Sequence, residues 1–172
     1  REVMDRKSTV SYCLDSLKKA GVDKASCTLS MTEKKELNVE IGEITLLRTT
    51  FNTNMGISAI KDQKESSTYI NKTDKDSIDS AIERVMEMAK GSQPDDAYDI
   101  AEEQPSQSFS KGDESANLDN MYQSLEEFVH YVKSTYPKIQ LEAAIMDFNH
   151  SISLIQNTNG VDFEIREGIY GF

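Results

Sequence analysis

The feature that most constrains the fold is a change in the spacing of apolar residues near the start of the chain. The apolar residues at positions 10–20 recur every three or four residues, which is the spacing of one face of an α-helix. They are Val10, Cys13, Leu14, Leu17 and Ala20. Gly21 follows as a typical helix stop, and from Ala25 onward apolar and polar residues alternate, as they do in a half-buried β-strand. The chain therefore has to combine helix and strand in one core.

The alternating pattern continues to about residue 71 and is broken by turn-forming residues. One apolar face carries Ala25, Cys27, Leu29 and Met31, and the pattern repeats at Leu37, Val39 and Ile41. Polar or glycine-containing turns are expected at residues 42–43, 52–54 and 62–63. Residues 25–71 are therefore predicted to form an antiparallel meander.

Two further helices and a second group of strands are predicted beyond residue 72. Thr73 opens a helix that ends at Gly91, and Asn117 caps another that Tyr136-Pro137 stops. Alternating residues follow at 139–145, 151–156 and 161–165, separated by turns at 149–150 and 157–160. The predicted fold class is α+β, with antiparallel meanders packed with three main helices.

A change of composition divides the chain into three predicted segments. Residues 1–91 form a helix–meander–helix N-terminal subdomain. Residues 92–116 contain two prolines, several serines and glutamines and two acidic pairs, and are predicted to be a mostly irregular linker. Residues 117–172 form a helix plus antiparallel strands, and this last part is expected to be truncated at its C-terminus.

The charge balance bears on which partners the chain can have. The net charge of −11 repels phosphate backbones and anionic lipid, so direct nucleic-acid and membrane partners are not expected. The sequence contains no apolar run long enough to span a bilayer, and a cytoplasmic location is the simplest interpretation.

Few residues are candidates for chemistry. Cys13 and Cys27 lie on the apolar sides of their segments, which predicts buried reduced thiols, with a disulfide as the alternative. His130 falls off the apolar stripe of its helix and is expected to be exposed, although Glu126 or Glu127 can share its side as metal ligands. The second histidine, at position 150, is expected in a turn.

Other polar and aromatic residues have structural interpretations. Arg48 and Arg166 lie on predicted strands, where a structural ion pair is the expected role. Four aromatic residues occur at element spacing and are expected in the core; they are Tyr69, Tyr122, Phe128 and Tyr131. The zinc-peptidase motif His-Glu-x-x-His and the serine-hydrolase motif Gly-x-Ser-x-Gly are both absent. The prediction is that this chain supplies no catalytic residue, no metal ligand and no cofactor site.

Several short motifs, taken in order, resemble the N-terminal region of the TldD/PmbA family of cytoplasmic peptide-processing metallopeptidases. Each is weak alone; they are the strand pair around the Gly-Glu turn at residues 40–44, the Gly-Ile strand at 56–60, the helix at 74–90 and the Asn-Thr-Asn-Gly turn at 157–160. Within the family, Ser58-Ala59 replaces a frequent arginine, and Gln63 and Ser66 replace frequent glycines. These departures favour the PmbA-like branch.

The resemblance implies a function that the residues alone do not define. It implies a non-catalytic N-terminal region of a peptidase complex that contributes to substrate-peptide handling and subunit assembly. The implied partners are another copy of the chain or a TldD-type paralogue, together with unfolded peptide. The alternative is a freestanding protein-binding or regulatory module without peptidase activity, for example one that acts on DNA gyrase.

Overall fold

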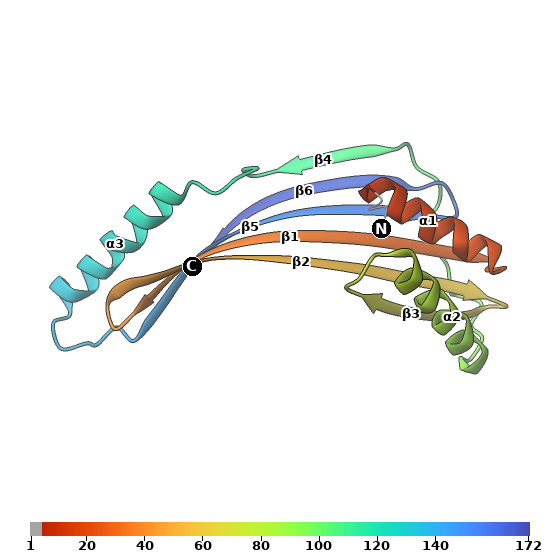
Figure 1. Ribbon diagram of the computed structural model, residues 1–172, viewed down its shortest axis with the longest axis horizontal. Coiled ribbons are helices and arrows are strands. Elements are labelled where there is room, and N and C mark those ends of the chain that lie inside the picture. The colour runs from red at the N-terminus through yellow and green to blue at the C-terminus, as the bar shows by residue number, and fades with distance from the viewer. Residues whose placement is uncertain (1–4) are drawn as a thin grey trace. The chain divides into compact units, whose positions relative to one another are not determined.

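The computed structural model describes residues 5–172 and confirms the predicted α+β class (Figure 1). Within this range the elements are α1 (Arg6–Lys19), β1 (Lys24–Glu40), β2 (Glu43–Lys61), β3 (Lys64–Ile70), α2 (Lys75–Gly91), β4 (Gln107–Lys111), α3 (Leu118–Thr135), β5 (Ala143–Asn157) and β6 (Asp162–Gly171). The strands form one mostly antiparallel sheet in the order β3-β2-β1-β5-β6-β4. Non-consecutive β1 and β5 are therefore neighbours at its centre.

Each described helix begins at a polar side chain that accepts a backbone N–H. Asp5 accepts from Ser8 at the start of α1, and Asn117 accepts from Asn120 at the start of α3, as predicted for Asn117. The cap of α2 is Asp74, one residue after the predicted Thr73. A carboxylate here accepts an orphan N–H and also interacts favourably with the positive end of the helix dipole.

One predicted turn, at residues 62–63, is confirmed by its backbone conformation, and the turn predicted at residues 42–43 lies one residue earlier, at Ile41-Gly42. Ile41 and Gly42 have φ values of 50° and 75°, and Asp62 and Gln63 have values of 51° and 59°. Two consecutive residues with positive φ make the tight turn whose twist matches that of an antiparallel hairpin. These turns connect β1 to β2 and β2 to β3.

Two other predicted turns are wrong. Residues 52–54 lie inside β2 and residues 149–150 lie inside β5, so each of these strands is one long, continuous element. Asparagine often marks a turn, but its amide can also be satisfied within a strand. Asn149 donates to the Asp147 carboxylate two residues away on the same face, at 2.8 Å. The strand therefore continues without a break.

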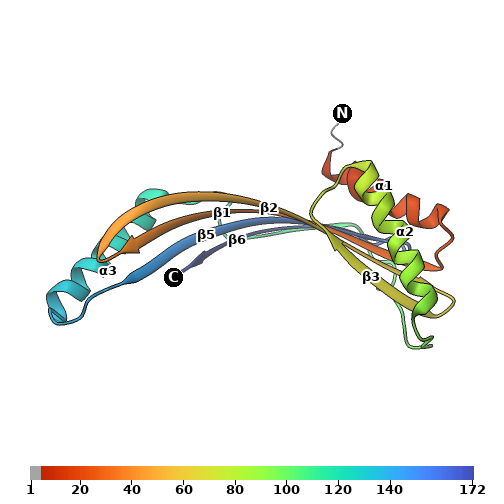
Figure 2. The same cartoon turned by 60° about the horizontal axis from the view of Figure 1, so that its bottom comes forward.

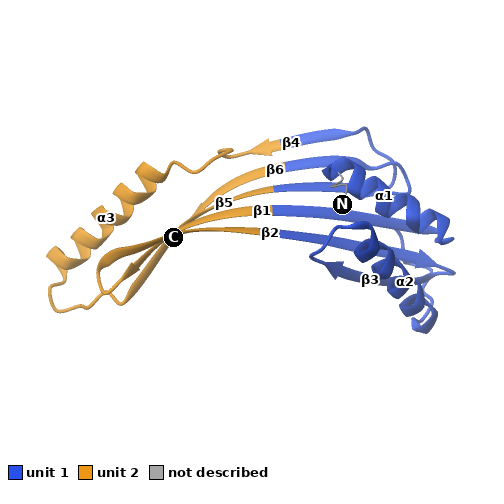
Figure 3. Cartoon of the chain, in the orientation of Figure 1, with its two compact units in different colours: residues 1–31, 52–109, 152–165 blue, residues 32–51, 110–151, 166–172 orange. Residues whose placement is uncertain are grey.

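The chain divides into two compact units, shown in blue and orange in Figure 3. Unit 1 comprises residues up to 31, 52–109 and 152–165, and unit 2 comprises residues 32–51, 110–151 and 166–172. β1, β2, β4, β5 and β6 contribute residues to both units. The predicted division into residues 1–91, 92–116 and 117–172 stays a prediction, although the middle segment contains the short strand β4.

Unit 1 is built around two neighbouring helices that cover one face of its strands. Figure 2 shows α1 and α2 lying side by side above β3 and the adjoining strands. The apolar residues on one side of α1 and α2 pack against the apolar face of the strands and form one cluster. Its buried members are Val10, Cys13, Leu14, Leu17, Ala25, Cys27, Leu29, Met55, Ile57, Ala59, Ile78, Ala81, Ile82, Val85 and Leu154.

Unit 2 has a smaller apolar cluster beneath a single described helix, α3. Leu37 and Val39 of β1 and Phe148 of β5 pack against one stripe of that helix. The helical members are Met121, Leu125 and Val129. This stripe has the spacing that the sequence predicted for the third helix.

Candidate functional site

The two cysteines form a buried pair in unit 1. Cys13 and Cys27 are both free and fully buried, and their Sγ atoms lie 3.1 Å apart. The hydrogen bond to Cys13, together with burial, raises the pKa of the Cys27 thiol far above its ordinary value. A thiolate is the reactive form, so this pair contributes packing rather than nucleophilic chemistry. The expectation of buried thiols is confirmed.

The histidines do not come together in a site. His130 is exposed on α3, as predicted. His150 lies within β5 instead of in the predicted turn. Its Nε2 atom is enclosed and has no hydrogen-bond partner within residues 5–172. Over the same residues, no group of three or more His, Cys, Asp or Glu side chains is placed to hold a metal ion. That the chain supplies no catalytic, metal or cofactor residue stays a prediction.

A buried carboxylate organises the polar face of unit 2. Glu36 is only 5% exposed, and its carboxylate contacts Arg48 at 2.5 Å and Lys34 at 3.0 Å. Lys34 also contacts Asp147 at 3.0 Å. A hydrogen bond from Asn38 and another from Lys34, with the nearby charge of Arg48, lower the pKa of Glu36 to about 2. The structural ion pair predicted for Arg48 is therefore confirmed.

Three of the tyrosines expected in the core lie at the surface instead. Tyr69 is 72% exposed, Tyr122 47% and Tyr131 56%. On β3 the side chains alternate, and Ser66 faces α2, so the odd-numbered Tyr69 lies on the other face. Its ring lies against Gly56, directly opposite on β2, where an added Cβ would come within 3.1 Å of the ring. The large aromatic ring of Tyr69 favours burial, but the sequence does not show which face of the strand the ring occupies.

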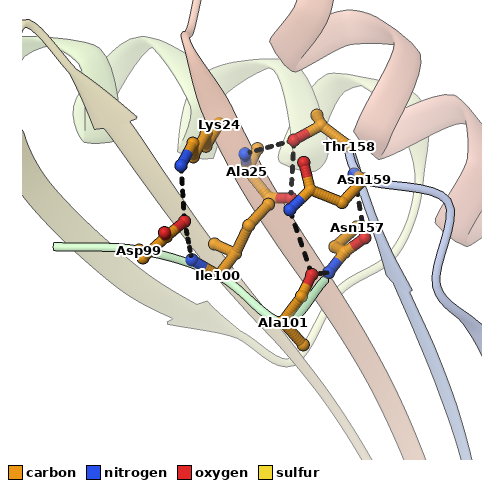
Figure 4. Close-up of polar contacts among 8 residues, drawn as sticks. All are labelled: Lys24, Ala25, Asp99, Ile100, Ala101, Asn157, Thr158 and Asn159. Atoms are coloured by element: carbon orange, nitrogen blue, oxygen red, sulfur yellow. Dashed lines mark hydrogen bonds and ion pairs between the residues drawn. The ribbon is translucent and has the colours of Figure 1, made fainter. Parts of the chain in front are cut away.

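The turn after β5 anchors the segment that precedes β4 (Figure 4). The Asn157 carboxamide oxygen accepts the N–H groups of Asn159 and Val161 at 2.9 and 3.1 Å, which closes the turn. The side-chain amides of Asn157 and Asn159 both donate to the carbonyl of Ala101, at 2.8 and 3.1 Å. The side chains of Asn157 and Asn159 therefore have structural roles: both hold the backbone at Ala101, and Asn157 also closes the turn.

The same turn is also fixed to the start of β1. The Thr158 hydroxyl accepts the N–H of Ala25 at 3.0 Å, and the Thr158 N–H donates to the Ala25 carbonyl at 2.9 Å. Next to them, Lys24 contacts the Asp99 carboxylate at 2.5 Å (Figure 4). The turn at residues 157–160, one of the motifs that carry the family resemblance, thus connects β1, β5 and the segment around residue 100.

One exposed feature of unit 1 is the outer edge of β3. β3 is the first strand in the sheet order and pairs with β2, and on its outer edge the described residues form only an isolated bridge, between Lys64 and Pro94. The register runs Lys61↔Lys64, Ile60↔Glu65, Ala59↔Ser66, Ser58↔Ser67, Ile57↔Thr68, Gly56↔Tyr69 and Met55↔Ile70. Because a two-residue turn closes the hairpin, hydrogen bonds to β2 fall on the even-numbered residues. The backbone groups of Ser67 and Tyr69 therefore point away from the sheet.

A groove lies beside this edge, between β3 and α2. We refer to it as the β3–α2 groove; it has a volume of about 700 Å³ and is lined by Asn54, Tyr69, Ile70, Asn71, Lys72, Asp76, Ser77, Ser80 and Arg84. The Ser66 hydroxyl donates to the Val85 carbonyl at 2.7 Å and holds α2 against β3. Neither Lys72 nor Arg84 forms an ion pair with any residue that the structure describes.

The fold and the groove define an α+β domain whose ligand-accessible feature is an unpaired strand edge beside a helix. Residues 27–89 match the family model of the PmbA/TldA metallopeptidase domain 1. The resemblance to the N-terminal region of the TldD/PmbA family is therefore supported over these residues. The PmbA-like branch stays a prediction. None of the described helices has the length and apolar character needed to cross a membrane.

Solved structures share the fold at low sequence identity. TldE from Thermococcus kodakarensis has a TM-score of 0.73 and 17% identity over 93% of this chain and 37% of its own. A proposed modulator of DNA gyrase from Bacteroides thetaiotaomicron has a TM-score of 0.73 and 14% identity, over 98% of this chain and 40% of its own. One from Thermotoga maritima has a TM-score of 0.65 and 14% identity, over 94% and 37%. The chain thus spans about two fifths of these proteins. Comparison with curated proteins finds no match.

Proposed function

We propose that the chain is the non-catalytic N-terminal region of a TldD/PmbA-type cytoplasmic peptidase complex and that it contributes to substrate-peptide handling and subunit assembly. The observation that carries the peptide-handling role is the open edge of β3. An extended peptide has unpaired N–H and C=O groups along its length, and a sheet edge offers the complementary row. Backbone pairing of this kind reads little of the sequence, which suits a protein that handles unfolded peptides.

The assembly role is supported by a second surface, on the part of β2 that belongs to unit 2. β3 pairs with β2 only from Met55 to Lys61, so residues 43–51 have no β3 partner. Three large apolar side chains are exposed there: Leu46 at 46%, Leu47 at 52% and Phe51 at 74%. An exposed apolar edge strand is typical of a surface that pairs with another chain. The occupant we favour is a TldD-type paralogue or another copy of the chain.

The test is a peptide-binding and peptidase experiment on the full-length parent, alone and mixed with its zinc-bearing paralogue. Ser67→Pro removes an outward-pointing N–H at a position where an edge strand tolerates proline. The matched control is Ser67→Ala, which removes the hydroxyl and keeps the N–H. We expect peptide capture to fall only in the proline variant. Metal-dependent cleavage by residues 1–172 alone would refute the non-catalytic role.

A regulatory module that acts on DNA gyrase is the second candidate, favoured by the names of two proteins that share the fold. The net charge of −11 argues that such a module would contact the enzyme rather than its DNA. A gyrase supercoiling assay with and without the full-length parent separates the two functions. Inhibition or activation that persists in Ser67→Pro would favour this second candidate.

A further inference from the structure

We propose that the β3–α2 groove selects extended peptide segments that carry an acidic side chain, which Arg84 recognises, next to an apolar side chain, which Tyr69 contacts. This inference rests on the proposed peptide-handling function and adds a substrate class to it. The occupant is a strand of peptide added to β3, with its side chains alternating between the α2 side and the Tyr69 side.

The outer edge of β3 already pairs with one extended segment of the same chain, which shows how an added strand can lie. Pro94 forms an isolated antiparallel bridge with Lys64, and the Asp95 N–H donates to the Gln63 carbonyl at 2.8 Å. The protein's own extended chain therefore occupies the outer edge at the start of β3. The edge groups of Ser67 and Tyr69 lie beyond that point. An added peptide would continue the same pairing along the rest of the strand.

The position of Arg84 follows from two contacts that fix α2 along β3. The Ser66 hydroxyl bonds to the Val85 carbonyl, and the Lys64 ammonium bonds to the Lys90 carbonyl at 3.1 Å. The helix thus runs antiparallel to the strand, and Arg84 lies near the level of Ser67. A peptide residue paired with Ser66 or Thr68, the two neighbours of Ser67 on the α2 face of the strand, points toward α2 and meets the guanidinium.

The charged side chains of the groove favour an acidic peptide residue beside Arg84 and do not favour one at the opposite end, beside Lys72 and Asp76. Arg84 is exposed and has no ion-pair partner in the described part of a chain whose net charge is −11. A guanidinium binds carboxylate in a two-point geometry that an ammonium cannot match. At the far end of the groove, Lys72 and Asp76 carry opposite charges, so the net field there is weaker. Arg84 is therefore the residue that distinguishes peptides.

Tyr69 supplies the second element of recognition. The residue is 72% exposed, although its ring lies against Gly56 on β2. Successive side chains of an added strand point to opposite faces, so the residue next to the acidic one lies on the Tyr69 side. Contact with an apolar side chain there covers the exposed ring.

The test measures binding of fluorescent hexapeptides to the full-length parent by anisotropy. One peptide has glutamate beside phenylalanine at its centre, and matched peptides replace the glutamate by glutamine or lysine. We expect the glutamate peptide to bind about tenfold more tightly than the glutamine peptide, and added salt to reduce this difference. Arg84→Gln should remove the preference, so that this variant binds the glutamate and glutamine peptides equally, whereas Arg84→Glu should favour the lysine peptide. Lys138→Gln, an equal charge change at an exposed site in unit 2, is the control.

The outcomes separate this inference from the function on which it rests. If all three peptides bind equally to wild type, and Ser67→Pro abolishes binding, the acidic preference is overturned while peptide handling stands. If no peptide binds, both fail. A peptide that is N-methylated at alternate residues keeps its side chains but cannot donate the backbone hydrogen bonds of strand pairing. Its binding to the wild-type protein tests strand addition without any protein variant that could fail to fold. Unchanged binding of that peptide would contradict strand addition itself.

Discussion

Units 1 and 2 cover their strands in different ways. Among the described residues, unit 1 packs α1 and α2 onto its strands and buries a large apolar cluster, whereas unit 2 has only α3 and a smaller cluster. Unit 2 instead buries a carboxylate: Glu36 is 5% exposed and is bonded to Asn38, Lys34 and Arg48. A buried apolar cluster is indifferent to pH, whereas a buried carboxylate that is paired with cations stabilises the fold only while it stays ionised.

The difference implies that the two units respond to different perturbations. Unit 1 should be sensitive to lost volume in its core and less sensitive to acid, because its carboxylates with a lowered pKa, such as Asp23 and Asp99, are exposed. Unit 2 should be sensitive to both, because fewer apolar contacts hold its helix and a titratable group completes its polar face. Four predictions test this contrast, from the largest expected effect to the smallest.

The largest effect is expected from truncating a matched pair of helical leucines. Leu17 in α1 and Leu125 in α3 are each fully buried, and replacing either by alanine should cost about 2–5 kcal/mol of unfolding free energy. Because the unit 2 cluster is smaller, Leu125→Ala should also increase hydrogen exchange in α3 before that in α2. Denaturant unfolding with site-resolved exchange measures both. Equal opening of α2 and α3 in both variants would mean that the units do not differ in local stability.

The next effect concerns Glu36. Glu36→Gln should cost about 1–3 kcal/mol at neutral pH, with the value reduced because Arg48 and Lys34 remain partly exposed. The folded-state pKa of about 2 is below the ordinary value of 4.5, so the stabilisation is complete above about pH 4.5 and is lost as the pH falls toward 2. Wild type should therefore lose stability over this range and Glu36→Gln should lose less. Exposed Glu126→Gln is the control, and parallel acid curves for all three proteins would count against the argument.

A smaller effect is expected at the turn of unit 1 shown in Figure 4. Asn157→Ala leaves the N–H groups of Asn159 and Val161 without their acceptor and removes a donor to Ala101, at a cost of about 1–3 kcal/mol. Limited proteolysis between residues 92 and 106 should become faster. Asn159→Ala removes one side-chain bond at an exposed site and should have less effect. Equal cleavage of both variants would show that Asn157 does not anchor this segment.

The smallest effects are expected at helix caps in the two units. Asp74→Ala in unit 1 and Asn117→Ala in unit 2 should each cost about 1 kcal/mol, because each cap accepts one backbone N–H. Asp74→Asn should restore most of the loss. Thermal unfolding of the four proteins measures these differences. A much larger loss for Asn117→Ala than for Asp74→Ala would strengthen the contrast, since it would mean that α3 depends more on its own local bonds.

Local patterns determined the helices, some of the turns and the family resemblance. The stripes of α1, α2 and α3 follow from a helix face that repeats over neighbouring residues, and the turn at residues 62–63 follows from its polar residues, whereas the turn predicted at residues 42–43 lies one residue earlier. The order of short motifs indicates the resemblance without any contact between distant residues. Asparagine at positions 54 and 149 misled the same reasoning, since a polar side chain satisfies its bonds equally well inside a strand.

Only the tertiary structure decided which strands are neighbours and which side chains are left open. The pairing of β1 with β5 joins segments that are far apart in sequence, and no local pattern encodes it. The groove depends on three elements at once: β3 must be an edge strand, α2 must be held beside it through Ser66, and Gly56 must leave room for the Tyr69 ring. Burial depends on what covers a residue, so the exposure of Tyr69 and the burial of Glu36 were fixed only when the chain had folded.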